Sequence, residues 1–466
     1  MSTTTVRPAG SGSVWYERTR DRVRDEAGRL RLVEFFLFLV MVLPFHVPGV
    51  GLDTHQFMPI VVVLYGLCRR PAVALGEYRW LVVLNALMLV YVGLVSALAD
   101  QSADAEDWKR RLFRMTVVTA MLWFIASGRI HIRSAVIGYL TGLALNIPAF
   151  YAGLASNDYG GYLTGFIGDK NQSGLAYAIF GLLGLMLFRT LPARLLWLLA
   201  AAVPLWLTGS RTSLAAFAAG ALWILLAPRL SVFWKLVLGL VIYWGVNLLN
   251  EDFSQVGVFS DRVGSDALRD RIDDASWAKV QTTGFFGRGL GEAVVHLLDS
   301  SGGTEEKAWF FHNSYWSAFV EGGWPWLIFI VAVTVLVGVR PFSSISVADP
   351  LAGRIAQGAA VALLVCAWRL GEVFYTNAWA VVLGLAIFVV RRGPRPPRSL
   401  LLRLGRRRRR HRSRLCAGAR AARRAGAVHL QLQGLGVVHA GQVHAGHLGA
   451  QGGGAGVDDH VPGAAK

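Results

Sequence analysis

Three short polar stretches interrupt an otherwise apolar chain, and their residue types suit the binding of an anion and the activation of a hydroxyl group. The first is residues 165–174, which read GFIGDKNQSG at the expected start of a helix. Asp169 or Asn171 can cap this helix by accepting hydrogen bonds from its free backbone N–H groups. In the functional interpretation, Lys170 and the open helix N-terminus together attract an anion.

The second stretch is residues 208–213, which read TGSRTS between two apolar segments. An arginine beside apolar helices is costly unless it is paired, solvated or lining a cavity, and snorkelling to the interface is the structural interpretation of Arg211. In the functional interpretation its planar guanidinium is reserved for phosphate oxygens, which it matches in geometry. Ser210, Thr212 and Ser213 could then donate further hydrogen bonds to the same anion.

The third feature is a polar stretch, residues 250–312, together with the apolar segment that follows it. Within it, residues 284–291 read GFFGRGLG, where the glycines allow tight turns and close approach of the backbone to a ligand. The stretch ends at His312, where polar sequence meets apolar sequence. A histidine at such a boundary is usually a cap or an interface residue, although its titration range suits a general base.

Twelve apolar segments surround these stretches and predict an all-α, polytopic bundle of about twelve membrane-spanning helices. Of the 466 residues 54% are hydrophobic and only 16% are charged, which is too few for the surface of a soluble protein of this size. A span needs about 20 apolar residues, with a lower limit near 17, and four of the segments are shorter. The segments are 32–47, 56–68, 80–99, 113–127, 133–153, 171–188, 192–208, 212–228, 233–249, 314–338, 354–371 and 377–391.

Basic residues in the loops predict the orientation of these helices, because cytoplasmic loops carry an excess of Lys and Arg. The arginine-rich segment 1–31, five loops and the C-terminal arginines fall on one side, which we expect to be cytoplasmic. The polar stretch 250–312, between the ninth and tenth helices, is then extracytoplasmic, and the protein is a multi-pass protein of the cytoplasmic membrane. The exception is Lys109–Arg111, which lies on the other side in a loop that also contains four carboxylates. The five loops contain Arg69–Arg70, Arg129 with Arg133, Arg189 with Arg194, Arg229 with Lys235, and Arg340 with Arg354.

Most of the net charge of +18 lies in the C-terminal tail and not on a nucleic-acid-binding face. From Arg391 onward the chain has fifteen Arg, one Lys and two Asp, which gives a net charge of +14. The residues before Arg391 therefore carry a net charge of +4. Residues 392–466 are basic and of low complexity. They are either a disordered cytoplasmic tail that binds anionic lipid or a frameshifted stretch of a GC-rich gene. In both cases we expect truncation after about Pro397 to preserve insertion and activity.

Taken together, the polar stretches resemble the O-antigen ligase and polymerase superfamily. The resemblance is carried by residues 169–171, by the turn at 210–213, by residues 287–291, and by residues 312–323, which read HNSYWSAFVEGG. The order, spacing and placement of these motifs around one large loop are more specific than any one of them. The motifs span about 165–340, and the matching topology is wider.

The resemblance implies a transmembrane glycosyltransferase domain over residues 32–391. Such an enzyme takes a glycan from a polyprenyl diphosphate and passes it to a sugar hydroxyl outside the cytoplasmic membrane, with no cofactor and no essential metal. It implies Arg211 and Arg288 as diphosphate contacts and His312 as the residue nearest the acceptor hydroxyl. The substrate-binding residues it implies are Lys170, Asn171, Ser210, Arg271, Asn313, Tyr315 and Glu321. The implied partners are the lipid-linked donor, a glycan, lipid or protein acceptor, and membrane lipids, with no nucleic acid.

Two alternatives stay open. Within the superfamily, a ligase moves a finished glycan to an acceptor, whereas a polymerase joins repeat units on a lipid carrier, and both need the same donor chemistry. Outside it, the chain could be a transporter or flippase for a lipid-linked glycan. Transporters typically show ionisable residues deep within their spans and internal repeats, and the sequence shows no evident repeat.

Overall fold

The structure is a computed structural model that describes residues 30–43, 54–102, 105–155, 157, 159–251, 263–298, 306–342 and 350–391. The chain falls into two units, Met1–Arg395 and Pro396–Lys466, and the second lies wholly outside the described residues. The predictions for the tail, and for all but the end of the N-terminal segment 1–31, therefore stay predictions.

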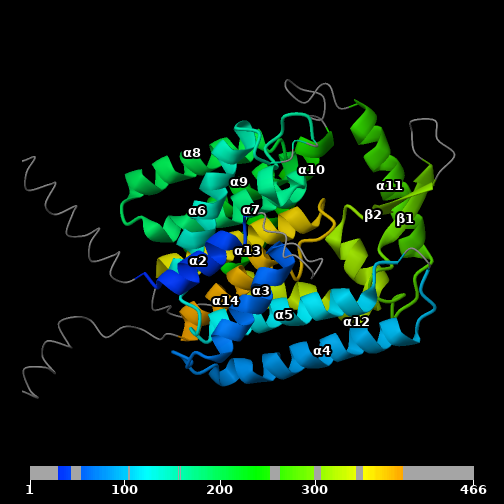
Figure 1. Ribbon diagram of the computed structural model, residues 1–466, viewed down its shortest axis with the longest axis horizontal. Coiled ribbons are helices and arrows are strands. Elements are labelled where there is room, and N and C mark those ends of the chain that lie inside the picture. The colour runs from blue at the N-terminus through cyan, green and yellow to red at the C-terminus, as the bar shows by residue number, and fades with distance from the viewer. Residues whose placement is uncertain are drawn as a thin grey trace, which may run out of the picture. The chain divides into compact units, whose positions relative to one another are not determined.

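The first unit is a helical bundle, as the sequence predicted, and a helix lies in each predicted apolar segment (Figure 1). These helices are α2 (Leu32–Val40), α3 (Thr54–Leu67), α4 (Arg79–Leu98), α5 (Trp108–Ala126), α6 (Ile132–Tyr151), α7 (Lys170–Gly184), α8 (Leu191–Leu207), α9 (Arg211–Leu226), α10 (Val232–Glu251), α12 (Ser314–Val333), α13 (Pro350–Ala367) and α14 (Asn377–Arg391). Short 3-10 turns occur at Gly76–Tyr78, Gly165–Ile167, Leu185–Leu187 and Ala227–Arg229, and a π-helical turn at Thr334–Val339 extends α12.

Five helical segments in the described part of the chain are long and apolar enough to cross a membrane. They are Gly76–Leu98, Ile132–Tyr151, Arg211–Arg229, Ser314–Val339 and Pro350–Arg369. The outer face of α4 shows the apolar exposure that lipid contact requires, because Val83, Leu87, Val90 and Leu94 recur every three or four residues and all are more than half exposed. The chain therefore has the character of a helical membrane protein.

Small residues let helices of the bundle approach closely. Gly220 of α9 and Gly358 of α13 face each other, and a Cβ added at Gly220 would lie 2.7 Å from the carbonyl oxygen of Gly358. Close packing of this kind is the main source of helix association in lipid, where burial of apolar surface between helices gains little. The pair explains why α9 and α13 pack along their length.

The described part of the polar stretch after α10, residues 263–298 and 306–312, is folded, which the sequence did not predict. It contains the amphipathic helix α11 (Val263–Gln281) and an antiparallel hairpin of β1 (Val294–Leu298) and β2 (Glu306–Phe310), paired in the register Val294 with Phe310. Ile272, Val295, Phe311 and Val320 form a small apolar core that joins α11 and the hairpin to α12. The folded stretch is thus tied to the bundle through the first turns of α12.

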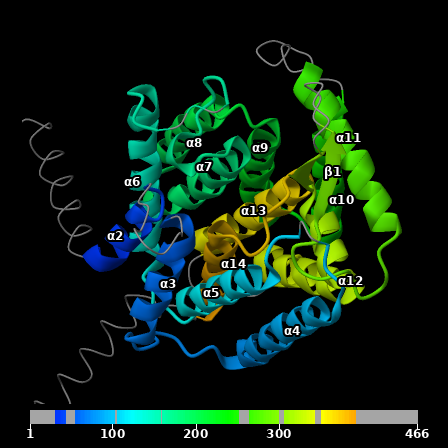
Figure 2. The ribbon, with the colours of Figure 1, turned by 45° about the vertical axis from the view of Figure 1, so that its right-hand side comes forward.

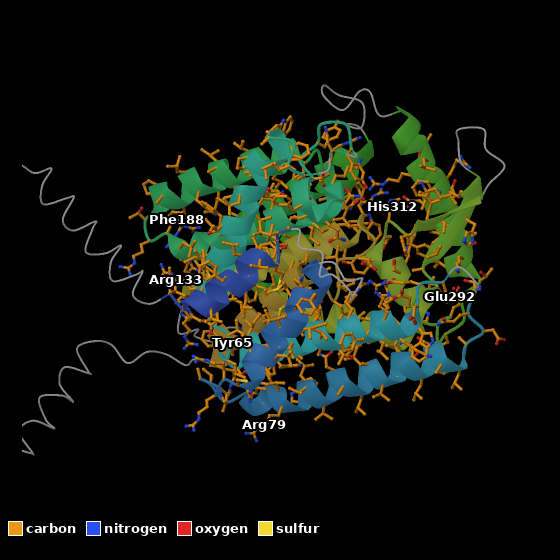
Figure 3. The ribbon with its side chains drawn as sticks, in the orientation of Figure 1. Tyr65, Arg79, Arg133, Phe188, Glu292 and His312 are labelled. Carbon is orange, nitrogen blue, oxygen red and sulfur yellow. The ribbon has the colours of Figure 1, made fainter. Side chains whose placement is uncertain are left out.

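The basic loops gather at one end of the bundle, which we call the basic end. Figure 3 shows Tyr65, Arg79, Arg133 and Phe188 there, and His312 and Glu292 at the opposite end. Two hydrogen bonds agree with this grouping. The Arg129 guanidinium donates to the Gly66 carbonyl oxygen at 3.1 Å, and that of Arg391 donates to the Ala74 carbonyl oxygen at 3.1 Å. The opposite end carries α11, the hairpin and the starts of α5, α7, α9 and α12, and we call it the loop end.

Candidate functional site

The first predicted motif starts α7 at the loop end, where Asp169 caps the helix. Its carboxylate accepts hydrogen bonds from the backbone N–H groups of Asn171 at 2.9 Å and Gln172 at 2.8 Å. Tyr159 donates to the other oxygen of Asp169 at 3.0 Å, and the Lys170 ammonium lies 5.5 Å from the centre of the Tyr159 ring. The capping interpretation therefore holds for Asp169, while Lys170 and the half-buried Asn171 remain beside the start of the helix.

The second motif starts α9 against the same part of α7. Ser210 caps α9 by accepting from the Ser213 backbone N–H at 3.4 Å, and its hydroxyl lies 2.8 Å from that of Ser213. Both serines contact Gly174 of α7, where an added Cβ would lie 2.6 Å from the Ser210 Cβ. Arg211, the first residue of α9, is half-buried. Two helix N-termini that lie far apart in the sequence are therefore neighbours.

His312 belongs to the same neighbourhood and is held neutral. Its burial lowers its pKa from the ordinary 6.5 to about 4; the charges of Arg269 and Lys170 act in the same direction, and that of Asp169 opposes them. The residues whose charges act on His312 belong to the 165–174 motif and to α11. Its Nδ1 atom is buried and has no hydrogen-bond partner among the residues that the structure describes. A neutral imidazole with an unsatisfied nitrogen can accept a hydrogen bond or a proton from a ligand.

Asn313 and Tyr315, which follow His312, have structural contacts. Asn313 caps α12, accepting from the backbone N–H groups of Tyr315 at 3.0 Å and Trp316 at 3.2 Å. The Tyr315 hydroxyl donates to the Leu364 carbonyl oxygen of α13 at 2.9 Å. These residues fix the start of α12 and so the position of His312. Their predicted role in substrate binding has no further support in the contacts.

Arg288 is held by hydrogen bonds to the end of α11. Its guanidinium donates to Thr283 Oγ1 at 3.2 Å and to Thr282 Oγ1 at 2.9 Å, at the end of α11. Arg271 is exposed on α11.

A buried charge cluster at the loop end is the largest feature that sequence reasoning missed. Arg111 of α5 contacts Glu321 of α12 and Glu106, each at 2.9 Å, and it also pairs with Glu372 in the loop between α13 and α14. Arg114, one turn along α5, pairs with Glu372 at 3.0 Å. Glu321, predicted as a substrate-binding residue, thus serves at least as a partner of Arg111. Its side chain is only 3% exposed.

Glu372 stays ionised in this cluster. Burial acts to raise its pKa, but the charges of Arg111 and Arg114 and their hydrogen bonds outweigh burial and lower the pKa to about 2. Gln172 of the α7 motif donates from its side-chain amide to the Glu372 backbone carbonyl at 3.0 Å. The cluster is therefore joined to the predicted 165–174 motif through the α13–α14 loop.

A cavity of about 490 Å³ opens beside this cluster. At one end its lining is charged or polar and includes Arg110, Arg111, Arg114, Glu372 and Gln172. The rest of its lining is mainly apolar and comes from α3, α5, α6, α7 and α12, including Ile60, Val118, Tyr139, Leu175 and Ile330. Such a cavity fits a ligand that has a polar head and an apolar chain.

A sequence signal for the cluster did exist. Lys109–Arg111 broke the charge pattern of the loops, and an intramembrane or interfacial cation on the unexpected side needs a partner. Its partners Glu321 and Glu372 lie 210 and 261 residues further along the chain. Only the tertiary structure, in which α5 packs against α14 and Arg111 reaches across to α12, brings these carboxylates to Arg111.

No known family model matches this chain, and a search of curated proteins likewise found no match.

Proposed function

We propose that this protein is a multi-pass membrane glycosyltransferase that transfers a glycan from a polyprenyl diphosphate to a sugar hydroxyl. In the proposed topology twelve helices cross the cytoplasmic membrane, the basic end faces the cytoplasm and the loop end faces outward. The motif resemblance to the O-antigen ligase and polymerase superfamily supports the reaction. The helical bundle and its apolar outer face support the setting in the membrane.

The cavity is the observation that carries the proposal. Its charged end lies at the loop end, beside Arg111 and Glu372, and its apolar lining continues between the helices. A polyprenyl-linked glycan has the same division, with an anionic diphosphate between a sugar and a long apolar chain. Arg110 and Arg114 line the charged end and offer guanidinium donors to such a diphosphate.

The site next to α7 supplies groups for the chemistry. In the proposed reaction the acceptor hydroxyl attacks the anomeric carbon of the donor sugar, and the bond from that carbon to the diphosphate oxygen breaks. The neutral His312 accepts the hydroxyl proton. Arg211 and Lys170, beside two helix N-termini, stabilise the charge that develops on the departing diphosphate. Arg288 is proposed as a further diphosphate contact on the resemblance alone.

One observation favours the transporter or flippase alternative. Arg111 and Glu321 form an ion pair that is largely buried between helices, and ionisable residues within spans are frequent on transport pathways. A flippase would move the intact lipid-linked glycan across the bilayer. It would form no glycosidic bond, so product analysis separates the two functions. Polymerase and ligase differ only in the acceptor and share the proposed site.

The decisive experiment uses the full-length protein in lipid vesicles with a polyprenyl diphosphate oligosaccharide and a glycan acceptor. We expect the wild type to form a new glycosidic bond and to release polyprenyl diphosphate. The His312→Ala variant should lose transfer and still bind the donor, because the imidazole acts on the acceptor. His131→Ala, at the basic end, is the matched control and should keep wild-type transfer. Full transfer by His312→Ala would exclude the proposed base.

A further inference from the structure

Within the glycine-rich run 284–291, the turn at Phe285–Phe286 packs against the sides of α4 and α12 and not beyond their ends. The Tyr91 hydroxyl of α4 donates to the Gly322 carbonyl oxygen at 2.8 Å, and the Phe286 carbonyl oxygen lies 3.4 Å from the same hydroxyl. The Trp324 backbone N–H donates to the Phe285 carbonyl oxygen at 3.0 Å. The turn at Phe285–Phe286 therefore lies between Tyr91 of α4 and the backbone of α12.

The positions of Tyr91 and Gly322 along their helices show that this turn lies some distance along the bundle from its loop end. Tyr91 lies seven residues before Leu98, the last residue of α4, which corresponds to about 10 Å along the helix axis. Gly322 lies eight residues after Ser314, the first residue of α12, or about 12 Å along that axis. Both helices belong to segments long and apolar enough to cross a membrane. Figure 2 shows the chain descending from α11 towards α4 and α12.

The sequence of α12 is adapted to receive the turn. Gly323 has φ 66° and ψ −164°, which interrupts the helix, and a Cβ there would collide with the Phe285 carbonyl oxygen. Gly287 has φ 83°, and its own Cβ would lie 2.6 Å from the Gly323 backbone nitrogen. Only glycine combines these positive φ angles with such a close backbone approach. The contact is therefore built into both segments.

The side chains of the turn point away from the protein. Phe285 is 60% exposed and Phe286 is 62% exposed, and their rings meet edge to face at 5.1 Å. Next to them on α12, Trp324 is 48% exposed, and the exposed apolar face of α4 continues through Val90 and Leu94. Two adjacent phenylalanines in water would be costly, whereas at this depth their neighbours are lipid-facing side chains.

We propose that the turn at Phe285–Phe286 inserts into the bilayer as a re-entrant anchor and contacts the acyl chains of the leaflet at the loop end. Non-helical backbone is tolerated at membrane depth where it is packed against protein. Here the Trp324 backbone N–H donates to the Phe285 carbonyl oxygen, and the backbone of the turn packs closely against Gly322 and Gly323 of α12. The anchor ties α11 and the hairpin to the membrane surface. It also holds Arg288, two residues further on, near the headgroup phosphates.

The anchor does not depend on the proposed transferase activity, and spin-label accessibility in lipid vesicles tests it directly. In a background with Cys68, Cys366 and Cys416 replaced by Ser, nitroxides are attached to Phe286→Cys and, separately, to Phe285→Cys. Leu94→Cys on α4 is the lipid-facing reference, and Asp274→Cys on the exposed side of α11 is the water-facing reference.

We expect the labels at positions 285 and 286 to collide several-fold more often with oxygen than with a water-soluble nickel chelate, as at position 94. The label at position 274 should show the inverse ratio. If both turn labels match position 274 while position 94 keeps its lipid ratio, the turn lies in water and the proposal is overturned. The Leu94 reference also confirms that the protein is folded and inserted.

Discussion

The two ends of the bundle use arginine in different ways. At the basic end, guanidiniums cap the ends of helices. Arg194 donates from Nε to the Phe188 carbonyl oxygen at 3.1 Å, and Arg229 donates to the Leu225 carbonyl oxygen at 2.8 Å. At the loop end, Arg111 and Arg114 share the carboxylates of Glu106, Glu321 and Glu372 around a cavity.

The difference separates arginines that cap helix ends from arginines that belong to a buried charge cluster. A guanidinium on a helix C-terminus satisfies free carbonyl groups, complements the helix dipole and stays in contact with water. A guanidinium buried among three carboxylates loses its hydration, so each member depends on the others. We therefore expect that another residue can replace an arginine at the basic end. Arg111, in contrast, must keep the position in which it pairs with its three carboxylates.

The largest effect is expected for removal of the buried cation. Arg111→Ala leaves Glu321 buried without its partner and should lower the free energy of unfolding by about 3–5 kcal/mol. Thermal unfolding of the purified protein in detergent measures the loss. A double variant, Arg111→Met with Glu321→Leu, should recover part of it, because the most buried carboxylate of the cluster is removed with its partner while Glu372 keeps its pair with Arg114. Equal losses for the single and double variants would contradict the pairing.

The next effect concerns the geometry of an arginine, not its charge. Under the proposed function, Arg211→Lys should reduce transfer about 100-fold, nearly as much as Arg211→Ala, because an ammonium cannot reproduce the bidentate fork. Arg194→Lys, at the basic end, is the matched control and should leave transfer unchanged. The reaction rate at saturating donor is the measurement. Wild-type activity of the Arg211→Lys variant would show that Arg211, like the arginines of the basic end, can be replaced by lysine without loss of transfer.

His312, at the loop end, should make both the stability of the protein and its transfer activity depend on pH. Because its pKa falls from 6.5 to about 4 on folding, the unfolded chain binds the proton more readily between these values. Stability should thus decline as the pH falls from 6.5 towards 4, and His312→Gln should flatten this decline in the melting temperature. The acid limb of transfer by the wild type should lie near pH 4. A limb near pH 6.5 would indicate that His312 is not held neutral by burial.

The smallest effect is expected for a capping arginine at the basic end. Arg229→Gln removes an exposed contact with the end of α9 and should cost no more than about 1 kcal/mol of stability. Reporter fusions at Arg70 and Ser276 should still give opposite signals in this variant, because the other basic loops remain. If Arg229→Gln lowered stability as much as Arg111→Ala does, arginines at the two ends would not differ in their contribution to stability.

Particular elements show where sequence reasoning succeeded and where it stopped. Apolar length located the helices because each must provide its own backbone hydrogen bonds in lipid. The GDKNQ and GSRTS turns were recognisable as helix starts, because capping side chains act within three residues of themselves. The helix and hairpin of the polar stretch were missed, since their small core includes Val320 of the neighbouring α12.

By itself, the sequence determined the helical class, the apolar segments, the grouping of the basic loops and the capped starts of α7 and α9. These depend on local composition and on periods of a few residues. Only the tertiary structure decided that Arg111 meets Glu321 and Glu372, that His312 lies near the α7 start, and that the turn at Phe285–Phe286 enters a break in α12. Each of these joins residues far apart in the chain, and such contacts depend on how helices pack, which no local pattern encodes.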